Sequence, residues 1–113
     1  MSHEYVAIVG SRGFAPLWRV RAYVNNLARG VVVISGGAPG VDREAERAAR
    51  ERRMLVLVVR PADPSNRRSY AVRNQKIVRV ADRVVAFWDG VSRGTAMVIA
   101  MARRAGKPCE VIR

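Results

Sequence analysis

Three short apolar runs that each end in a glycine-containing turn constrain the fold of this chain more than any other feature. A helical pattern follows each turn, which indicates a strand, a tight loop and a helix start. Such a junction directs free backbone N–H groups and the positive end of a helix dipole toward one point, an arrangement that suits a phosphate. The runs and their turns are residues 31–34 before 35–42, residues 6–9 before 10–13, and residues 84–88 before 89–95.

Strands and helices are expected to alternate along the whole chain. Strands that are apolar throughout are buried on both faces, and short connections between alternating elements imply right-handed crossovers and parallel pairing. The sequence therefore predicts an α/β fold, a Rossmann-like three-layer sandwich with a five-stranded parallel sheet in the order 3-2-1-4-5 and about four helices. The expected strands are residues 5–9, 31–34, 54–59, 83–88 and 109–112, and the expected helices are residues 16–29, 42–53, 70–81 and 95–105, with a polar loop at 60–69.

Local signals support the expected helices. Pro16 in a first turn and Gly30 after a last turn are typical boundary residues. In the helix expected at 70–81, Asn74 interrupts an otherwise apolar face, and a buried asparagine needs hydrogen-bond partners. Arg73 is expected near the start of that helix, where its guanidinium can reach an anion. The other residues on the same face are Tyr70, Ile77 and Ala81.

Length and composition indicate one globular domain, residues 1–113. No apolar run approaches the roughly 20 residues of a membrane span, and residues 1–4 lead directly into the first strand, so no signal peptide is expected. The single cysteine, Cys109, excludes an internal disulfide and favours a reducing cytoplasm. The single histidine, His3, falls in a terminus that is expected to fray, so no metal site is predicted.

The formal net charge is +12, and almost all of the cations are arginines; only Lys76 and Lys107 are lysines. A strong positive field attracts nucleotides and nucleic acid. An arginine-rich proteome with a solvated surface would produce the same composition, and the arginines are scattered over every expected helix rather than clustered in one run. Charge alone therefore leaves both interpretations open.

The predicted topology brings the three glycine turns together. In open parallel sheets, ligands bind beyond the carboxyl ends of the strands where the strand order reverses, which here is between the first and fourth strands. The sequence therefore predicts a phosphate or ligand site at this edge of the sheet. Its expected residues are Gly10, Ser11, Arg12, Ser35, Gly36, Gly37, Ala38, Gly40, Asp42, Arg73, Asn74, Ser92, Gly94 and Thr95.

Two positions in this set have an alternative structural role. Asp42 opens a helix, where an aspartate serves equally well as a cap or a partner of the helix dipole. A carboxylate repels phosphate, so a ligand contact by Asp42 is expected to involve a sugar hydroxyl instead. Either Ser92 or Thr95 can cap the last helix.

Two further features concern large apolar side chains. Trp88 ends a strand, where it can belong to the core or stack on a base. The last helix is apolar nearly all round, which indicates either deep burial or a subunit interface. A homodimer or larger oligomer is therefore expected, with Met97 or Met101 at or near the interface.

The motifs resemble the SLOG superfamily, which unites the Rossmann domain of DNA-processing protein A with the Lonely-guy phosphoribohydrolases, and are most similar to its compact YspA-type branch. The resemblance implies a Rossmann-like fold, a nucleotide or nucleotide-derived ligand at the glycine loops, and oligomers. The matching segments are Val9-Gly10-Ser11-Arg12-Gly13-Phe14, Ser35-Gly36-Gly37-Ala38-Pro39-Gly40-Val41-Asp42, Arg73-Asn74, Ala86-Phe87-Trp88-Asp89-Gly90 and Ser92-Arg93-Gly94-Thr95.

The expected function is binding of a nucleotide or a phosphorylated nucleoside derivative, with no cofactor required. A nucleotide N-glycosidase with Asp42 or Asp89 as its carboxylate is the enzymatic alternative. The Lonely-guy enzymes carry Pro-Gly-Gly-x-Gly-Thr followed shortly by a glutamate, and here Gly94-Thr95 is followed by Ala-Met-Val-Ile. The resemblance is also compatible with single-stranded DNA binding, as in the DNA-processing branch, and with carriage of a molybdenum cofactor.

Overall fold

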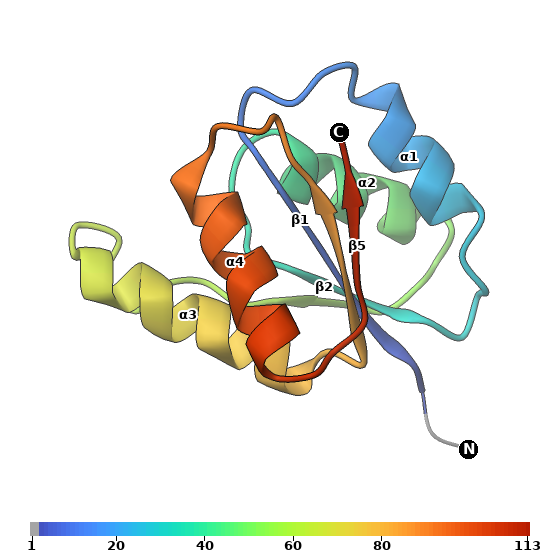
Figure 1. Ribbon diagram of the computed structural model, residues 1–113. Helices are drawn as coiled ribbons and strands as arrows, with labels where there is room; N and C mark the ends of the chain where they lie inside the picture. The colour runs from blue at the N-terminus through green and yellow to red at the C-terminus, as the bar shows by residue number, and fades with distance from the viewer. Residues whose placement is uncertain (1–2) are drawn as a thin grey trace.

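The computed structural model describes residues 3–113 and has the predicted topology (Figure 1). Five parallel strands form one sheet in the order β3-β2-β1-β4-β5. The α/β class, the strand order and the four helices are as predicted. In chain order the elements are β1 (Tyr5–Gly10), α1 (Trp18–Asn25), β2 (Val32–Ser35), α2 (Val41–Glu51), β3 (Val56–Val58), α3 (Arg67–Val80), β4 (Arg83–Phe87), α4 (Arg93–Arg104) and β5 (Cys109–Ile112).

Helices cover both faces of the sheet because successive side chains of a strand point to opposite sides. In β1, Val6 and Ile8 pack with α1 and α2, whereas Ala7 and Val9 pack with α3 and α4. All four of these side chains are buried. This continuous apolar run therefore becomes the central strand of a three-layer sandwich, and its carboxyl end opens at the switch point.

The edge of the sheet differs from the expectation of strands buried on both faces. The strand expected at 54–59 pairs only over Val56–Val58, and Leu55 and Leu57 on it are 63% and 38% exposed. Met54 and Val59 are buried but lie outside the ladder. An edge strand has one neighbour and incomplete helix cover, so an apolar run there does not imply burial.

The helices expected at 16–29 and 70–81 have different bounds. α1 covers only Trp18–Asn25, because Leu27 already closes a tighter turn by donating its N–H to the carbonyl of Val24 at 3.1 Å. α3 begins at Arg67, three residues earlier than expected. The side-chain oxygen of Asn66 accepts the N–H of Arg68 at 2.9 Å and caps the helix. Arg73 therefore lies in the middle of α3 rather than near its start.

His3, which was expected to lie in a frayed terminus, contacts the fold. Its Nδ1 lies 2.9 Å from the carbonyl oxygen of Gly30, in the turn before β2. The structure shows no grouping of three or more His, Cys, Asp or Glu side chains suited to a metal ion within residues 3–113. Within the same range, none of the helices is long and apolar enough to cross a membrane.

Candidate functional site

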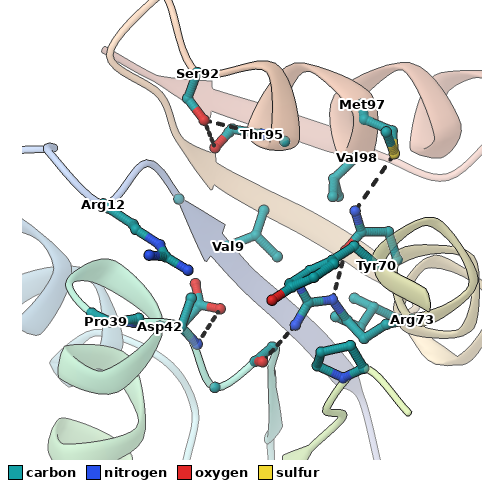
Figure 2. A pocket seen from close by; sticks show the side chains of 18 of the residues that line it. Val9, Arg12, Pro39, Asp42, Tyr70, Arg73, Ser92, Thr95, Met97 and Val98 are labelled. Carbon is teal, nitrogen blue, oxygen red and sulfur yellow. Dashed lines mark hydrogen bonds between the residues drawn. The ribbon is translucent and has the colours of Figure 1, made fainter. Parts of the chain in front are cut away.

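A cavity of about 630 Å³ opens at the carboxyl ends of β1, β2 and β4, where the strand order reverses (Figure 2). It lies on the α3 and α4 side of the sheet and reaches the start of α2. Cavities of this size typically hold small-molecule ligands. The lining residues are Val9, Gly10, Arg12, Gly13, Gly36, Gly37, Ala38, Pro39, Asp42, Arg60, Pro61, Pro64, Tyr70, Arg73, Asn74, Ile77, Asp89, Ser92, Gly94, Thr95, Met97 and Val98.

Most of the residues predicted for the site line this cavity, but Ser11, Ser35 and Gly40 do not. Ser11 and Ser35 bond to neighbouring segments instead, and Gly40 lies close to the backbone of Arg12, whose carbonyl oxygen would be 2.9 Å from a Cβ on Gly40. Ser11 is 1% exposed; its Oγ lies 3.3 Å from Oγ1 of Thr95 and accepts the N–H of Asp89 at 3.2 Å. The first glycine turn is thereby joined to the turn before α4.

The turn at residues 36–38 differs from the expected phosphate cradle. The N–H of Gly37 donates to Oγ of Ser35 at 3.0 Å, and the N–H of Ala38 donates to Oδ2 of Asp42 at 3.3 Å. Ser35 in turn donates to Oε2 of Glu46 at 2.5 Å. Two backbone donors of the turn are therefore already used, so this turn is not a ready-made anion site.

Two glycines of the site are required by close packing. A Cβ on Gly10 would lie 2.6 Å from the side chain of Val41, so this glycine lets β1 approach α2. A Cβ on Gly36 would lie 2.7 Å from Nη1 of Arg73 and 2.8 Å from Oδ2 of Asp42. Gly36 therefore leaves room for these two charged side chains, which both line the cavity.

Asp42 is a buried acid in the first turn of α2 and does not cap that helix. The N-cap is Gly40, and Asp42 is only 4% exposed. Its Oδ1 atom has no hydrogen-bond donor among residues 3–113. Burial raises the pKa of the carboxyl to about 6, against the opposing influence of the Ala38 N–H and the guanidinium of Arg73.

Arg73 is fixed in place by bonds to its own surroundings. Its Nη1 donates to the carbonyl of Gly36 at 2.6 Å, and its Nε donates to Oδ1 of Asn74 at 2.8 Å. Asn74 is buried, and its Nδ2 lies 3.7 Å from Sδ of Met97. The predicted interruption of the apolar face thus has partners, and it orients the arginine.

An aromatic and apolar wall completes the site, and sequence reasoning did not assign it to ligand binding. Tyr70 lies in the first half of α3 with its hydroxyl donating to the carbonyl of Pro64 at 3.0 Å, and the guanidinium carbon of Arg73 lies 5.4 Å from its ring centre. Figure 2 shows Tyr70 across the cavity from Arg12 and Asp42. The feature of the sequence that could have indicated this wall is the helical face that Tyr70 shares with Asn74. Ile77, Met97 and Val98 extend the wall.

The turn before α4 has its own internal bonds. Ser92 is the N-cap, and its Oγ accepts the N–H of Thr95 at 3.4 Å. Asp89 accepts the N–H groups of Val91 and Ser92, both at 2.8 Å, and these bonds lower the pKa of its carboxyl. The Asp89 carboxylate therefore stays ionised and shapes the loop.

Trp88 does not line the cavity. Its indole N–H donates to the carbonyl of Ser92 at 3.0 Å, and the guanidinium of Arg113 lies over its ring. The interpretation in which Trp88 stacks on a base in this cavity is therefore wrong.

The sequence of residues 1–79 matches the model of the family described as DNA recombination-mediator protein A. The chain belongs to the DNA recombination-mediator protein A family. The matched residues include the first two glycine turns and the Arg73–Asn74 pair, whereas the turn before α4 lies beyond them. No curated protein matches the sequence.

Solved structures share the fold of this family member. DNA processing protein A from Streptococcus pneumoniae superposes with a TM-score of 0.88 at 19% identity, over 98% of this chain and 50% of that one. DNA processing protein A from Helicobacter pylori, which binds single-stranded DNA, superposes with a TM-score of 0.76 at 24% identity, over 96% of this chain and 64% of that one. A third structure, of the protein TM1055, has a TM-score of 0.72 at 26% identity, over 94% of this chain and 72% of that one. The chain thus spans about half the length of the Streptococcus pneumoniae protein.

Proposed function

We propose that this family member binds one nucleotide in the cavity at the switch point. The observation that supports the proposal is the order in which three kinds of side chain line one cavity: a cationic rim, a buried carboxylate, and an aromatic and apolar wall. A phosphate, a sugar and a base carry the complementary groups in the same order. No cofactor is needed for this binding.

The phosphate is assigned to the side of the cavity that Arg12 shares with the start of α4. The planar guanidinium of Arg12 is exposed at the rim and suits a phosphate. Gly94 also lines the cavity, in the first turn of α4, where backbone N–H groups lack intrahelical partners and the helix dipole is positive. A Cβ on Gly94 would meet nothing within 4 Å, so the space beside its Cα is open.

The base is assigned to the opposite wall. The ring of Tyr70 provides a stacking surface that its hydroxyl bond to Pro64 holds in place. Ile77, Met97 and Val98 add apolar contact on the same side. Stacking on an aromatic side chain contributes roughly 1–3 kcal/mol per base and is tolerant of base identity.

Titration calorimetry with AMP and with adenosine tests this assignment. AMP should bind clearly more tightly than adenosine, and Arg12→Ala should weaken AMP about tenfold or more, because hydrogen bonds to charged groups contribute roughly 1.5–3 kcal/mol. Arg43→Ala is the matched control, since Arg43 is exposed on α2 outside this cavity. Equal affinity of AMP for wild type and Arg12→Ala would contradict the assignment.

Single-stranded DNA binding is a second candidate. It is favoured by the net charge of +12, by family membership, and by the single-stranded DNA binding of the Helicobacter pylori protein. Oligonucleotide binding would neutralise several phosphates, so the logarithm of affinity should fall with that of salt concentration at about −0.7 per phosphate. Mononucleotide binding should have a shallow slope. Tight, steeply salt-dependent oligonucleotide binding that Arg12→Ala weakens would favour DNA.

Two finer assignments accompany the proposal. Placement in the YspA-type branch of the SLOG superfamily is proposed from the motifs of the glycine turns and the Arg73–Asn74 pair. Nucleotide N-glycosidase activity is the enzymatic alternative, with Asp42 or Asp89 as its carboxylate, since both residues line the cavity. Incubation with AMP and chromatography for released adenine tests this activity.

A further inference from the structure

We infer that Asp42 binds a ribose hydroxyl and makes the cavity selective for ribonucleotides over deoxyribonucleotides. The inference rests on the proposed nucleotide function and names the class of nucleotide that the site accepts. Its basis is the buried carboxylate of Asp42, which lines the cavity and has one oxygen, Oδ1, with no donor among residues 3–113.

The two oxygens of Asp42 differ in their surroundings. Oδ2 accepts the N–H of Ala38 at 3.3 Å, whereas Oδ1 has less than 1 Å² of accessible surface and no donor within the described chain. Figure 2 shows the carboxylate directed toward the cavity, between Arg12 and Tyr70. Buried carboxylate oxygens are ordinarily hydrogen-bonded, so an unused acceptor at the wall of a cavity indicates a donor on the ligand.

The side chains of Arg73 and Glu46, which approach Asp42, form their hydrogen bonds with other residues. Arg73 contributes charge, but its Nη1 and Nε atoms donate to Gly36 and Asn74. Glu46 is an acceptor in the same helix and binds Ser35 and Arg50. Arg12 on the rim is exposed and is assigned to phosphate. The carboxylate therefore has one bonded oxygen, Oδ2, and one oxygen, Oδ1, without a donor among residues 3–113.

The chemistry of an unpaired carboxylate oxygen selects its partner. A phosphate carries the same sign of charge and is repelled. A sugar hydroxyl donates one hydrogen bond without an opposing charge, and its bond to an ionised acceptor is stronger than one between neutral groups. In the proposed orientation the sugar lies between the phosphate at Arg12 and the base at Tyr70. Asp42 lines the cavity between these two residues.

A site built to bind a hydroxyl rejects the analogue that lacks it, because the buried acceptor is then left unpaired. AMP should therefore bind more tightly than its deoxy analogues. Removal of the hydroxyl that Asp42 accepts should weaken binding by about 10- to 100-fold. A ribose-selective cavity would likewise hold the deoxyribose of single-stranded DNA poorly.

The experiment is calorimetric titration of the full chain with AMP, 2′-deoxy-AMP and 3′-deoxy-AMP. We expect at least one deoxy analogue to bind about tenfold or more weakly than AMP to the wild type. In Asp42→Asn this preference should shrink to within about threefold, since a neutral amide replaces the carboxylate. Asp82→Asn is the matched control because Asp82 bonds the N–H of Tyr5, outside the cavity, and it should keep the full preference.

The outcomes separate this inference from the function on which it rests. Absence of AMP binding to the wild type would overturn both. AMP binding with equal affinity for both deoxy analogues would leave the proposed function standing and overturn the ribose contact; water would then serve Oδ1. A uniform loss of all three ligands in Asp42→Asn, with the preference unchanged, would indicate a contact to the base and contradict the inference. Circular dichroism verifies that Asp42→Asn is folded. The comparison of AMP with its deoxy analogues on the wild-type protein does not depend on the folding of this variant.

Discussion

At the scale of single residues, the most consequential group is the carboxyl of Asp42, whose burial affects folding as well as binding. Its pKa is raised from 3.8 to about 6 in the folded state, chiefly by desolvation. Between these values the folded chain binds more protons than the unfolded chain, so stability falls as the pH rises through this window. Above about pH 6 the ionised carboxylate lowers stability by about 3 kcal/mol, from the 1.36 kcal/mol that each pKa unit represents.

The substitution Asp42→Asn should therefore stabilise the domain at pH 7. The gain over wild type should be on the order of 2–3 kcal/mol at pH 7 and should vanish near pH 4, where the native carboxyl is already protonated. Urea unfolding of both proteins at pH 4, 5.5 and 7 measures the difference. A variant that is less stable than wild type at pH 7 would show that the carboxylate stabilises the fold.

At the scale of elements, the contact between β1 and α2 depends on the absence of one side chain. A Cβ on Gly10 would lie 2.6 Å from Cβ, Cγ1 and Cγ2 of Val41, which is fully buried. The carboxyl end of the central strand and the start of α2 are thereby held against each other. This contact fixes the position of Asp42 relative to β1, because Asp42 follows Val41 in α2. Gly10 and Asp42 both line the cavity.

Gly10→Ala should destabilise the domain by about 1–3 kcal/mol, the usual cost of overpacking a close-packed interior. Gly30→Ala is the matched control because a Cβ there would meet nothing within 4 Å and the backbone φ does not favour glycine; it should change stability by no more than about 0.5 kcal/mol. The free energy of unfolding in urea distinguishes them. Equal stability of the two variants would mean that α2 shifts freely relative to β1.

At the scale of the whole molecule, the last helix is more completely covered than its composition suggested. Val98 and Ile99 are buried against the sheet, Met101 packs on the same core, and Met97 is 40% exposed at the cavity edge. One chain thus covers most of the apolar surface of α4 by itself. The exposed part of Met97 and the exposed Val72 on α3 are apolar surface that remains on this side of the sheet.

We nevertheless expect a homodimer or larger oligomer that uses the α3 and α4 side of the sheet. Sedimentation velocity at micromolar concentration should give a mass of at least two chains. Val72→Glu should reduce it, because the introduced charge would be desolvated at the interface; Val91→Glu, at an exposed site in the loop before α4, is the comparison for a change in surface charge alone. A monomer at these concentrations would reject the expectation.

The amino-acid sequence by itself determined the fold class and the strand order. Apolar runs separated by amphipathic helical segments specify burial through local periodicity, and the handedness of crossovers leaves few topologies. The convergence of the glycine turns followed from that order. The ends of the elements were less predictable. The cap at Asn66 starts α3 at Arg67 and so places Arg73 in the middle of the helix. Other residues nearby give signals for a helix start of similar strength.

Tertiary structure decided what each residue at the site does. Ser11 and Ser35 carry the residue types of a ligand site, but their neighbours across the fold use their hydroxyls. Asp42 differs because Arg73, from a helix later in the chain, is held by Asn74 and Gly36, and Oδ1 has no donor among residues 3–113. Hydrogen-bond partners across a fold depend on packing between distant segments. The sequence alone therefore located the cavity, and only the folded chain distinguished the groups that face it from those that support it.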